Sequence, residues 1–167
     1  KLFVSIYAGV ADNRLFHSPD GVSWTEATMT GEPPAASGDQ INHLLSFGTT
    51  LIMTFWKGPN ILVYKSTDDG ANVSSVCSIP SAGPSLGLVS WINHDGDDVP
   101  WIRTREGWGW IDLTTSAYVP VVNVPTEAST ARGLTVWGGL LHVPEQEGQN
   151  RCYYSSGALV VEAIGLN

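Results

Sequence analysis

Short hydrophobic runs alternate with turn residues along the chain, and no stretch longer than about ten residues keeps a convincing helical period. The first residues, KLFVSIYAG, already have the pattern of a strand. The segments between the runs are rich in Gly, Pro, Asn and Asp, which favour tight turns. The pattern therefore predicts an all-β protein.

One pattern recurs along the chain: a leucine, an aromatic residue three positions later, and soon afterwards a turn rich in Gly, Asn or Asp. It occurs at residues 44–47 (LLSF), 88–91 (LVSW) and 134–137 (LTVW), which start 44 and then 46 residues apart. Three more strand-like runs follow each copy, as LIMTFW, ILVYKS and VSSVCSIP follow the first. A four-stranded antiparallel unit of roughly 45 residues is the period of a β-propeller blade.

This period predicts a single propeller domain, or a segment of a propeller, with about four blades. The expected blades are approximately residues 1–38, 39–83, 84–128 and 129–167. The first supplies only KLFVSIYA, RLFHS and SWTEATM, which correspond to strands two to four, so it lacks its inner strand. Because a propeller ring leaves no blade open, we expect residues before Lys1, another segment, or another copy or chain to complete this blade.

The composition supports a folded β protein and excludes several classes. With 43% hydrophobic and only 14% charged residues, the chain is not disordered. The counts of 18 Gly, 10 Pro and 7 Trp are typical of many short strands joined by tight turns. The net charge of −8 repels phosphate backbones, so we expect no nucleic-acid partner. No apolar run approaches the roughly 18 residues that span a bilayer, so we expect no membrane span.

A polar turn lies between the third and fourth strands of the first two units. In the first unit it contains Ser18, Asp20, Gly21 and Trp24. In the second it contains Ser66, Asp68 and Gly70, with Val73 in place of the tryptophan; the two serines are 48 residues apart. The third unit has residues 113–116 (LTTS), without the acid or the glycine, and the fourth has residues 155–157 (SSG), without the acid.

These turns resemble the Asp box, S-x-D-x-G-x-x-W, of the bacterial-neuraminidase-type repeats found in sialidases and many other propellers. The first copy is one residue shorter than the usual form. A motif that repeats at the blade period favours architecture, since one active site needs one copy. We expect Asp20 and Asp68 to accept hydrogen bonds from turn amides, the serines to fix the same turns, the glycines to allow positive φ, and Trp24 to cover the hairpin core.

The resemblance implies that ligands bind at the opposite face, where strands two and three are joined and where the units are connected. These segments hold aromatic and charged side chains, which sugar and carboxylate sites use. Residues 101–110 alone carry three Trp, two Arg and one Glu. For each residue, packing against a neighbouring blade is the alternative interpretation. The candidate ligand-binding residues are His43, Trp56, Lys57, Arg103, Arg105, Glu106, Trp108 and Arg132.

Catalytic, metal and cofactor chemistry have little support in the sequence. A sialidase would need six blades, three arginines around the substrate carboxylate and a Tyr-Glu nucleophile pair. This chain has five arginines, no R-I-P-type motif near its start and no assignable Tyr-Glu pair. The four histidines lack metal-ligand spacing, and residues 93–98 (NHDGDD) fit a solvated turn better than a calcium loop. Cys77 and Cys152 are expected to be buried free thiols rather than a disulfide.

The sequence thus predicts a non-enzymatic binding or structural module that presents propeller loops to a carbohydrate or protein partner. An acidic, lysine-poor and tryptophan-rich chain suits an extracellular or virion setting, such as a phage tail or receptor-binding component. The alternatives are a fragment of a sialidase-like glycoside hydrolase and a lectin with one sugar pocket per blade. The loops differ between units, which counts against the lectin. A structural protein is expected to bury Trp56, Trp101 or Trp108 against another chain.

Overall fold

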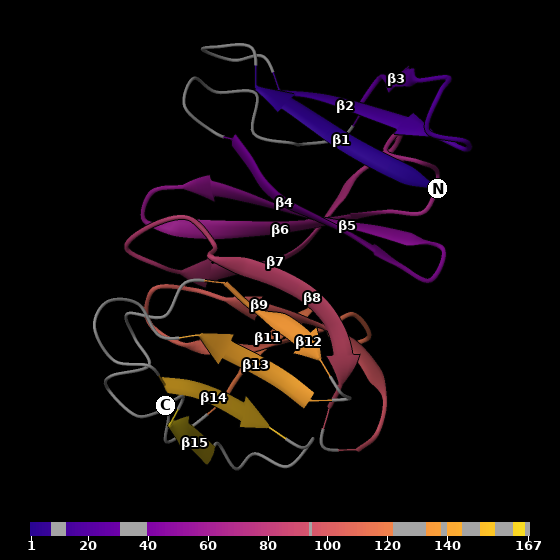
Figure 1. Ribbon diagram of the computed structural model, residues 1–167. Coiled ribbons are helices and arrows are strands. Elements are labelled where there is room, and N and C mark those ends of the chain that lie inside the picture. The colour runs from indigo at the N-terminus through magenta and orange to yellow at the C-terminus, as the bar shows by residue number, and fades with distance from the viewer. Residues whose placement is uncertain are drawn as a thin grey trace. The chain divides into compact units, whose positions relative to one another are not determined.

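The computed structural model describes residues 1–7, 13–30, 40–93, 95–121, 133–137, 140–144, 151–155 and 162–165, and every regular element in these ranges is a β-strand (Figure 1). The strands form one three-stranded and three four-stranded sheets. Each sheet is an open meander, in which strands adjacent in sequence pair in antiparallel fashion. The all-β fold class is therefore confirmed. The chain separates into two compact units, residues Lys1–Pro84 and Ser85–Asn167.

The first unit contains two sheets that align strand by strand. The three-stranded sheet has β1 (Leu2–Tyr7), β2 (Asn13–Ser18) and β3 (Thr25–Ala27). The four-stranded sheet has β4 (Gln40–Phe47), β5 (Thr50–Lys57), β6 (Asn60–Ser66) and β7 (Ser74–Pro80). Ser18 ends β2 as Ser66 ends β6, so β1 corresponds to β5. The strand that would correspond to β4 is absent from the three-stranded sheet.

The core of the first unit joins these two sheets. Leu15 on β2 is fully buried among side chains of β5 and β6, and Phe3 on β1 packs against the same cluster. Phe55 and Tyr64 meet edge to face there, with ring centroids 5.4 Å apart. One face of the β1–β3 sheet is thus covered, because alternate residues of a strand point to opposite faces. The core residues are Leu15, Leu51, Met53, Phe55, Tyr64 and Val73.

The second unit also contains two sheets. The first has β8 (Gly87–Ile92), β9 (Asp98–Arg103), β10 (Trp108–Asp112) and β11 (Ala117–Pro120). The other has β12 (Thr135–Trp137), β13 (Leu140–Pro144), β14 (Arg151–Ser155) and β15 (Glu162–Gly165). A Cβ atom at Gly87 would lie 2.6 Å from the backbone nitrogen of Leu134. Glycine is therefore needed where β8 approaches the segment leading into β12.

Tryptophans form the core of the second unit. The rings of Trp91 and Trp101 lie 5.5 Å apart, and those of Trp101 and Trp110 lie 5.2 Å apart, both pairs tilted. Trp108, Val121 and Leu141 complete the cluster. Trp101 and Trp108 are only 2% and 1% exposed, so they fill the interior of their own unit. Neither ring is therefore left on the surface, where it could pack against another chain as was expected for a structural protein.

Candidate functional site

The polar turn of the first unit, residues 18–24 (the first corner), is closed by two side chains. The hydroxyl of the buried Ser18 accepts a hydrogen bond from the Gly21 amide at 2.8 Å and donates to the Asp20 carboxylate at 3.0 Å. Asp20 also accepts bonds from the Ser23 and Val22 amides, both at 2.8 Å, and these bonds lower its pKa. Gly21 has a φ of 78°, which favours glycine.

Residues 66–73 form the second corner, which has the same plan. Ser66 accepts a bond from the Gly70 amide at 2.9 Å and donates to Asp68 at 2.8 Å. Asp68 accepts bonds from the side-chain and backbone amides of Asn72, which lower its pKa. Gly70 has a φ of 90°. These contacts account for the serine, acid and glycine of both corners as parts of the architecture.

A third corner, residues 112–116, joins β10 to β11, and its acid was missed in the sequence. Asp112 accepts bonds from the Thr115 hydroxyl at 2.6 Å and from the Thr114 and Thr115 amides at 2.8 and 3.1 Å, which lower its pKa. Ser116 takes the positive φ, at 57°. Residues 113–116 do lack the acid and the glycine of the other corners, but Asp112, at the strand-ending position that serine holds in those corners, accepts the hydrogen bonds of this turn. The corresponding turn after Ser155 lies outside the described residues.

The last residues of the first two corners differ in burial. Val73 is 7% exposed and belongs to the core shared with β2, whereas Trp24 is 42% exposed. More than half of the Trp24 surface is therefore covered, but the side chain is not part of the buried core. Val73 is covered because the β1–β3 sheet lies against it. In the described part of the first unit, no further sheet covers Trp24 in the same way.

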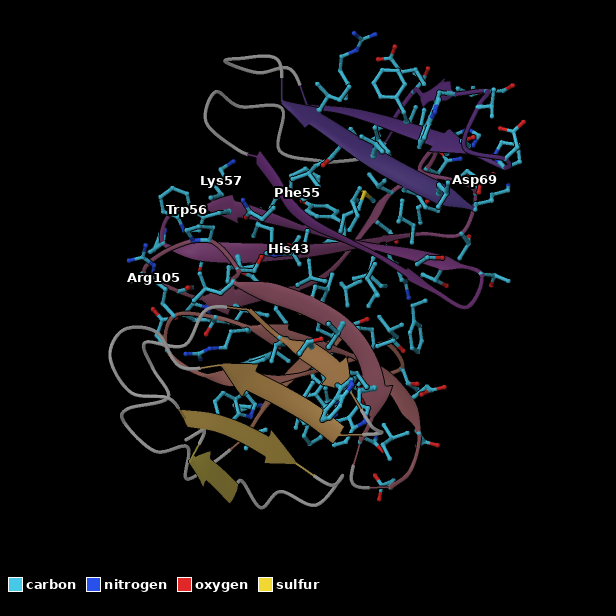
Figure 2. The ribbon with its side chains drawn as sticks, viewed as in Figure 1. His43, Phe55, Trp56, Lys57, Asp69 and Arg105 are labelled. Atoms are coloured by element: carbon cyan, nitrogen blue, oxygen red, sulfur yellow. The ribbon has the colours of Figure 1, made fainter. Side chains whose placement is uncertain are left out.

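The turn between β5 and β6 carries three of the expected ligand-binding residues on or near it. Lys57 is exposed, and Trp56 is half-buried, with its ring over Gly58: a Cβ atom there would lie 3.2 Å from Trp56 Cζ2. His43 on β4 pairs in register with Thr54, and its partial burial lowers its pKa. Figure 2 shows Trp56 and Lys57 at the end of the first unit opposite to Asp69 in the second corner.

The equivalent turn of the second unit, between β9 and β10, is flanked by a buried arginine and a buried tryptophan. The Arg103 guanidinium lies 5.5 Å from the ring centroid of Trp108, an arrangement typical of a cation–π contact. Arg103 is 0% exposed, and burial lowers its pKa to about 10. Both side chains therefore support the turn from within. Arg105 and Glu106, between them, are exposed.

Thr104 holds this turn in shape, a role that was missed in the sequence. Its hydroxyl donates to the Gly107 carbonyl and accepts bonds from the Glu106 and Gly107 amides, at 3.1 to 3.2 Å. Its backbone amide also donates to the Gly107 carbonyl at 2.8 Å. Thr104 is 2% exposed. The sequence feature that could have indicated this role is a threonine three residues before a glycine, because Thr hydroxyls often hydrogen-bond to backbone groups of the turn that follows them.

The remaining candidate, Arg132, and one exposed tryptophan lie outside the two turns. Arg132 lies outside the described residues. Trp137, which was not a candidate, is 76% exposed at the end of β12. Its equivalent in the previous repeat, Trp91, is 5% exposed, so the repeat pattern alone did not separate the exposed ring from the buried one.

A cavity of about 320 Å³ lies at the corner end of the first unit, away from Trp56 and Lys57. The side chains of Lys1 and Asp69 form an ion pair at its edge, with 2.5 Å between nitrogen and oxygen. Its other lining residues are Phe3, Ser46, Gly48, Thr49, Thr50, Leu51 and Thr67.

Within the described ranges, no group of three or more His, Cys, Asp or Glu side chains is placed to hold a metal ion. The same part of the chain contains no helix with the length and hydropathy needed to cross a membrane. No protein-family model matches the sequence, and no curated protein matches it.

Proposed function

We propose that the protein is a non-enzymatic binding module of the propeller type, in which polar corners brace four-stranded sheets and the turns at the other sheet ends meet a carbohydrate or protein partner. The meander order of every described sheet supports this arrangement. So does the approach of β8 to β12 in the second unit, since each is the first strand of its four-stranded sheet. Blades that fan from an axis bring their inner strands together in this way.

The observation that carries the proposal is the fixed turn at residues 104–107. Thr104 closes it with three side-chain hydrogen bonds, while Arg103 and Trp108 anchor its two ends inside the unit. Arg105 and Glu106 are therefore presented to solvent on a rigid support. A partner that binds charged groups held in this way loses less conformational freedom than one that must order a loose loop.

The carboxylates of the corners are poorly suited to act as a general acid. A glycosidase needs one carboxyl group whose pKa is raised, so that it stays protonated and can act as a general acid. Asp20, Asp68 and Asp112 instead have lowered pKa values, because they accept hydrogen bonds within their own turns. Glu26 likewise has its pKa lowered by hydrogen bonding to Arg14. The acidic, lysine-poor composition supports an extracellular or virion-associated setting.

A glycan array probed with the labelled 167-residue protein tests the proposal. We expect retained glycans, and we expect the double variant Arg105→Ala/Glu106→Ala to lose about tenfold or more in affinity for them. Thr114→Ala, at the third corner, is the matched control and should bind as the parent does. Binding that survives the double variant but is lost in Thr114→Ala would contradict the proposed surface.

The same preparation separates the enzymatic alternative. Incubation with a fluorogenic sialoside should release no fluorophore beyond the level of a heat-denatured sample. Turnover that scales with protein concentration would replace the proposal with the glycoside hydrolase. If the array retains no glycan, the proposal of a carbohydrate partner is wrong. The proposal of a protein partner is then tested by comparing the proteins captured on the immobilised parent chain with those captured on the immobilised double variant.

A further inference from the structure

The segment that follows β3 ends against the second corner. The Thr30 backbone amide donates to the Ala71 carbonyl at 2.8 Å, and the Val73 amide donates to the Thr30 carbonyl at 3.0 Å. Thr30 and Asn72 accordingly form a parallel β-bridge. Because the second corner joins β6 to β7, these bonds connect the chain that leaves the three-stranded sheet to the other sheet of the first unit.

The Thr30 side chain adds a second set of contacts to the same corner. Its hydroxyl oxygen lies 2.6 Å from Asn72 Oδ1 and 2.9 Å from the Ala71 carbonyl oxygen. A hydroxyl has one proton to donate, so the two acceptors share it. The amide oxygen of Asn72 is the nearer of the two and therefore the main partner of the hydroxyl.

Asp68 sets the orientation of the Asn72 side chain. The Nδ2 amide of Asn72 donates to Asp68 Oδ2 at 2.6 Å, and this leaves Oδ1 to face the Thr30 hydroxyl. An ionised carboxylate can only accept hydrogen bonds, so it cannot take the Oδ1 end of the amide instead. A chain of hydrogen bonds therefore runs from Asp68 through Asn72 to Thr30, from one sheet to the other.

These polar contacts lie at the rim of an apolar contact between the two sheets. A Cβ atom at Gly70 would lie 2.2 Å from Leu15 Cδ2 and 3.4 Å from the Ala27 Cβ. Val73 is 7% exposed and belongs to the same core as Leu15, whereas Thr30 and Asn72 are exposed. Release of Thr30 would therefore open the rim of this contact to water.

We propose that Asp68, Asn72 and Thr30 form a latch that holds the chain after β3 on the second corner. When one bond of the latch is lost, this segment opens while the β4–β7 sheet stays folded, because the four strands of that sheet pair with one another. Local openings of this kind need less free energy than global unfolding. The inference does not depend on the ligand or on the turn at residues 104–107.

Hydrogen exchange of the Thr30 and Val73 amides measures the latch, because both amides donate across it. Thr30→Val keeps the shape of the side chain and removes the hydroxyl, and it should lower the protection factor of the Val73 amide by about fivefold or more. The amides of β5, which is paired on both sides, should keep their protection. Thr30→Ser keeps the hydroxyl and should restore the protection of Val73.

Thr28→Val is the matched control. Thr28 is an exposed threonine of the same segment, and within the described residues its side chain makes no hydrogen bond to the second corner. Its substitution should leave the Val73 amide as protected as in the parent. Unchanged protection in Thr30→Val would overturn the latch, and so would a loss that Thr30→Ser does not reverse. An equal loss in β5 would mean that the unit opens as a whole, which also contradicts the proposal.

Asp68→Asn tests the link through Asn72. An amide at this position can both donate and accept, so it no longer determines which end of the Asn72 amide faces Thr30. The protection of the Val73 amide should fall again, but the same change in the Thr30→Val background should have little further effect, because the hydroxyl is already absent. Losses that multiply in the double variant would show that Asp68 does not act through Thr30. Circular dichroism of each variant shows that the fold is kept.

Discussion

Asp68 accepts two hydrogen bonds from Asn72, one from the backbone amide at 2.8 Å and one from the side-chain amide at 2.6 Å. With the bond from Ser66, the ionised carboxylate closes the second corner from both sides. Charge-assisted bonds of this kind are stronger than neutral ones. The corner is therefore held by a charge, and its stability depends on the protonation state of Asp68.

The free energy of unfolding should fall as the solution is acidified. The hydrogen bonds from Asn72 and Ser66 hold the pKa of Asp68 below its ordinary value of 3.8 in the folded protein. Between the folded and unfolded pKa values the unfolded chain binds more protons, so stability rises with pH. The contribution is fully present above about pH 4 and is lost as the pH falls through the folded-state pKa.

Urea unfolding of the parent and of Asp68→Asn, from neutral pH down to about pH 3, measures this effect. The variant should be less stable at neutral pH and should depend less on pH. Asn72→Ala removes one of the donors and should give an intermediate slope. Equal slopes for all three proteins would show that the carboxylate does not hold the corner.

Among the described glycines of the first unit, Gly70 is the one where an added methyl group should be most harmful. It has a φ of 90°, and a Cβ atom there would lie 2.2 Å from Leu15 Cδ2 in the core. Gly70→Ala should therefore lower the free energy of unfolding by about 2 to 4 kcal/mol, from the strained φ and the overpacked core together.

Gly96→Ala is the control for backbone strain alone. Gly96 has a similar φ of 87°, but nothing lies within 4 Å of a Cβ atom placed on it. Its substitution should cost only about 1 kcal/mol. Equal losses for the two variants in urea unfolding would mean that the second corner does not pack on the β1–β3 sheet as described.

Two arginines of one turn should respond differently to truncation. Arg103→Ala removes a fully buried side chain that packs on Trp108, and should cost about 2 to 4 kcal/mol of stability. Arg105→Ala removes an exposed side chain and should change stability by no more than about 0.5 kcal/mol. Thermal and urea unfolding compare them directly. A stable Arg103→Ala protein would mean that Arg103 does not support the turn.

The sheets could be predicted from the sequence because strand pairing follows local patterns. The run at residues 61–66 is β6, and each expected unit holds one meander, because an alternating run next to a tight turn pairs with its neighbour. Asp112 was missed because the search of the sequence used a motif of fixed spacing. A carboxylate needs only two amides within reach, and these can follow at several spacings, so a fixed motif does not find every such turn.

Burial could not be predicted in the same way. Trp91 and Trp137 hold the same position of the repeat, yet one is buried and the other is 76% exposed. Trp24 and Val73 likewise hold the same position of a corner, yet Trp24 is exposed and Val73 is buried. Whether a strand face is covered depends on the sheet packed against it, which is a contact distant in sequence. For the same reason the buried roles of Arg103 and Trp108 emerge only from the structure.

Cys77 should be an unreactive thiol in the folded protein. It is a free cysteine on β7, and burial raises its pKa to about 11. The thiolate is the reactive form, so at about pH 8 only about one thousandth of the thiol is ready to react. In the Cys152→Ser variant, iodoacetamide should modify Cys77 slowly in buffer and at least about a hundredfold faster in urea that unfolds the chain. Because alkylation does not require a disulfide partner, the rate reports directly on the surroundings of this one sulfur. Equal rates in the folded and unfolded protein would mean that the thiol is open to water and not partly buried on β7.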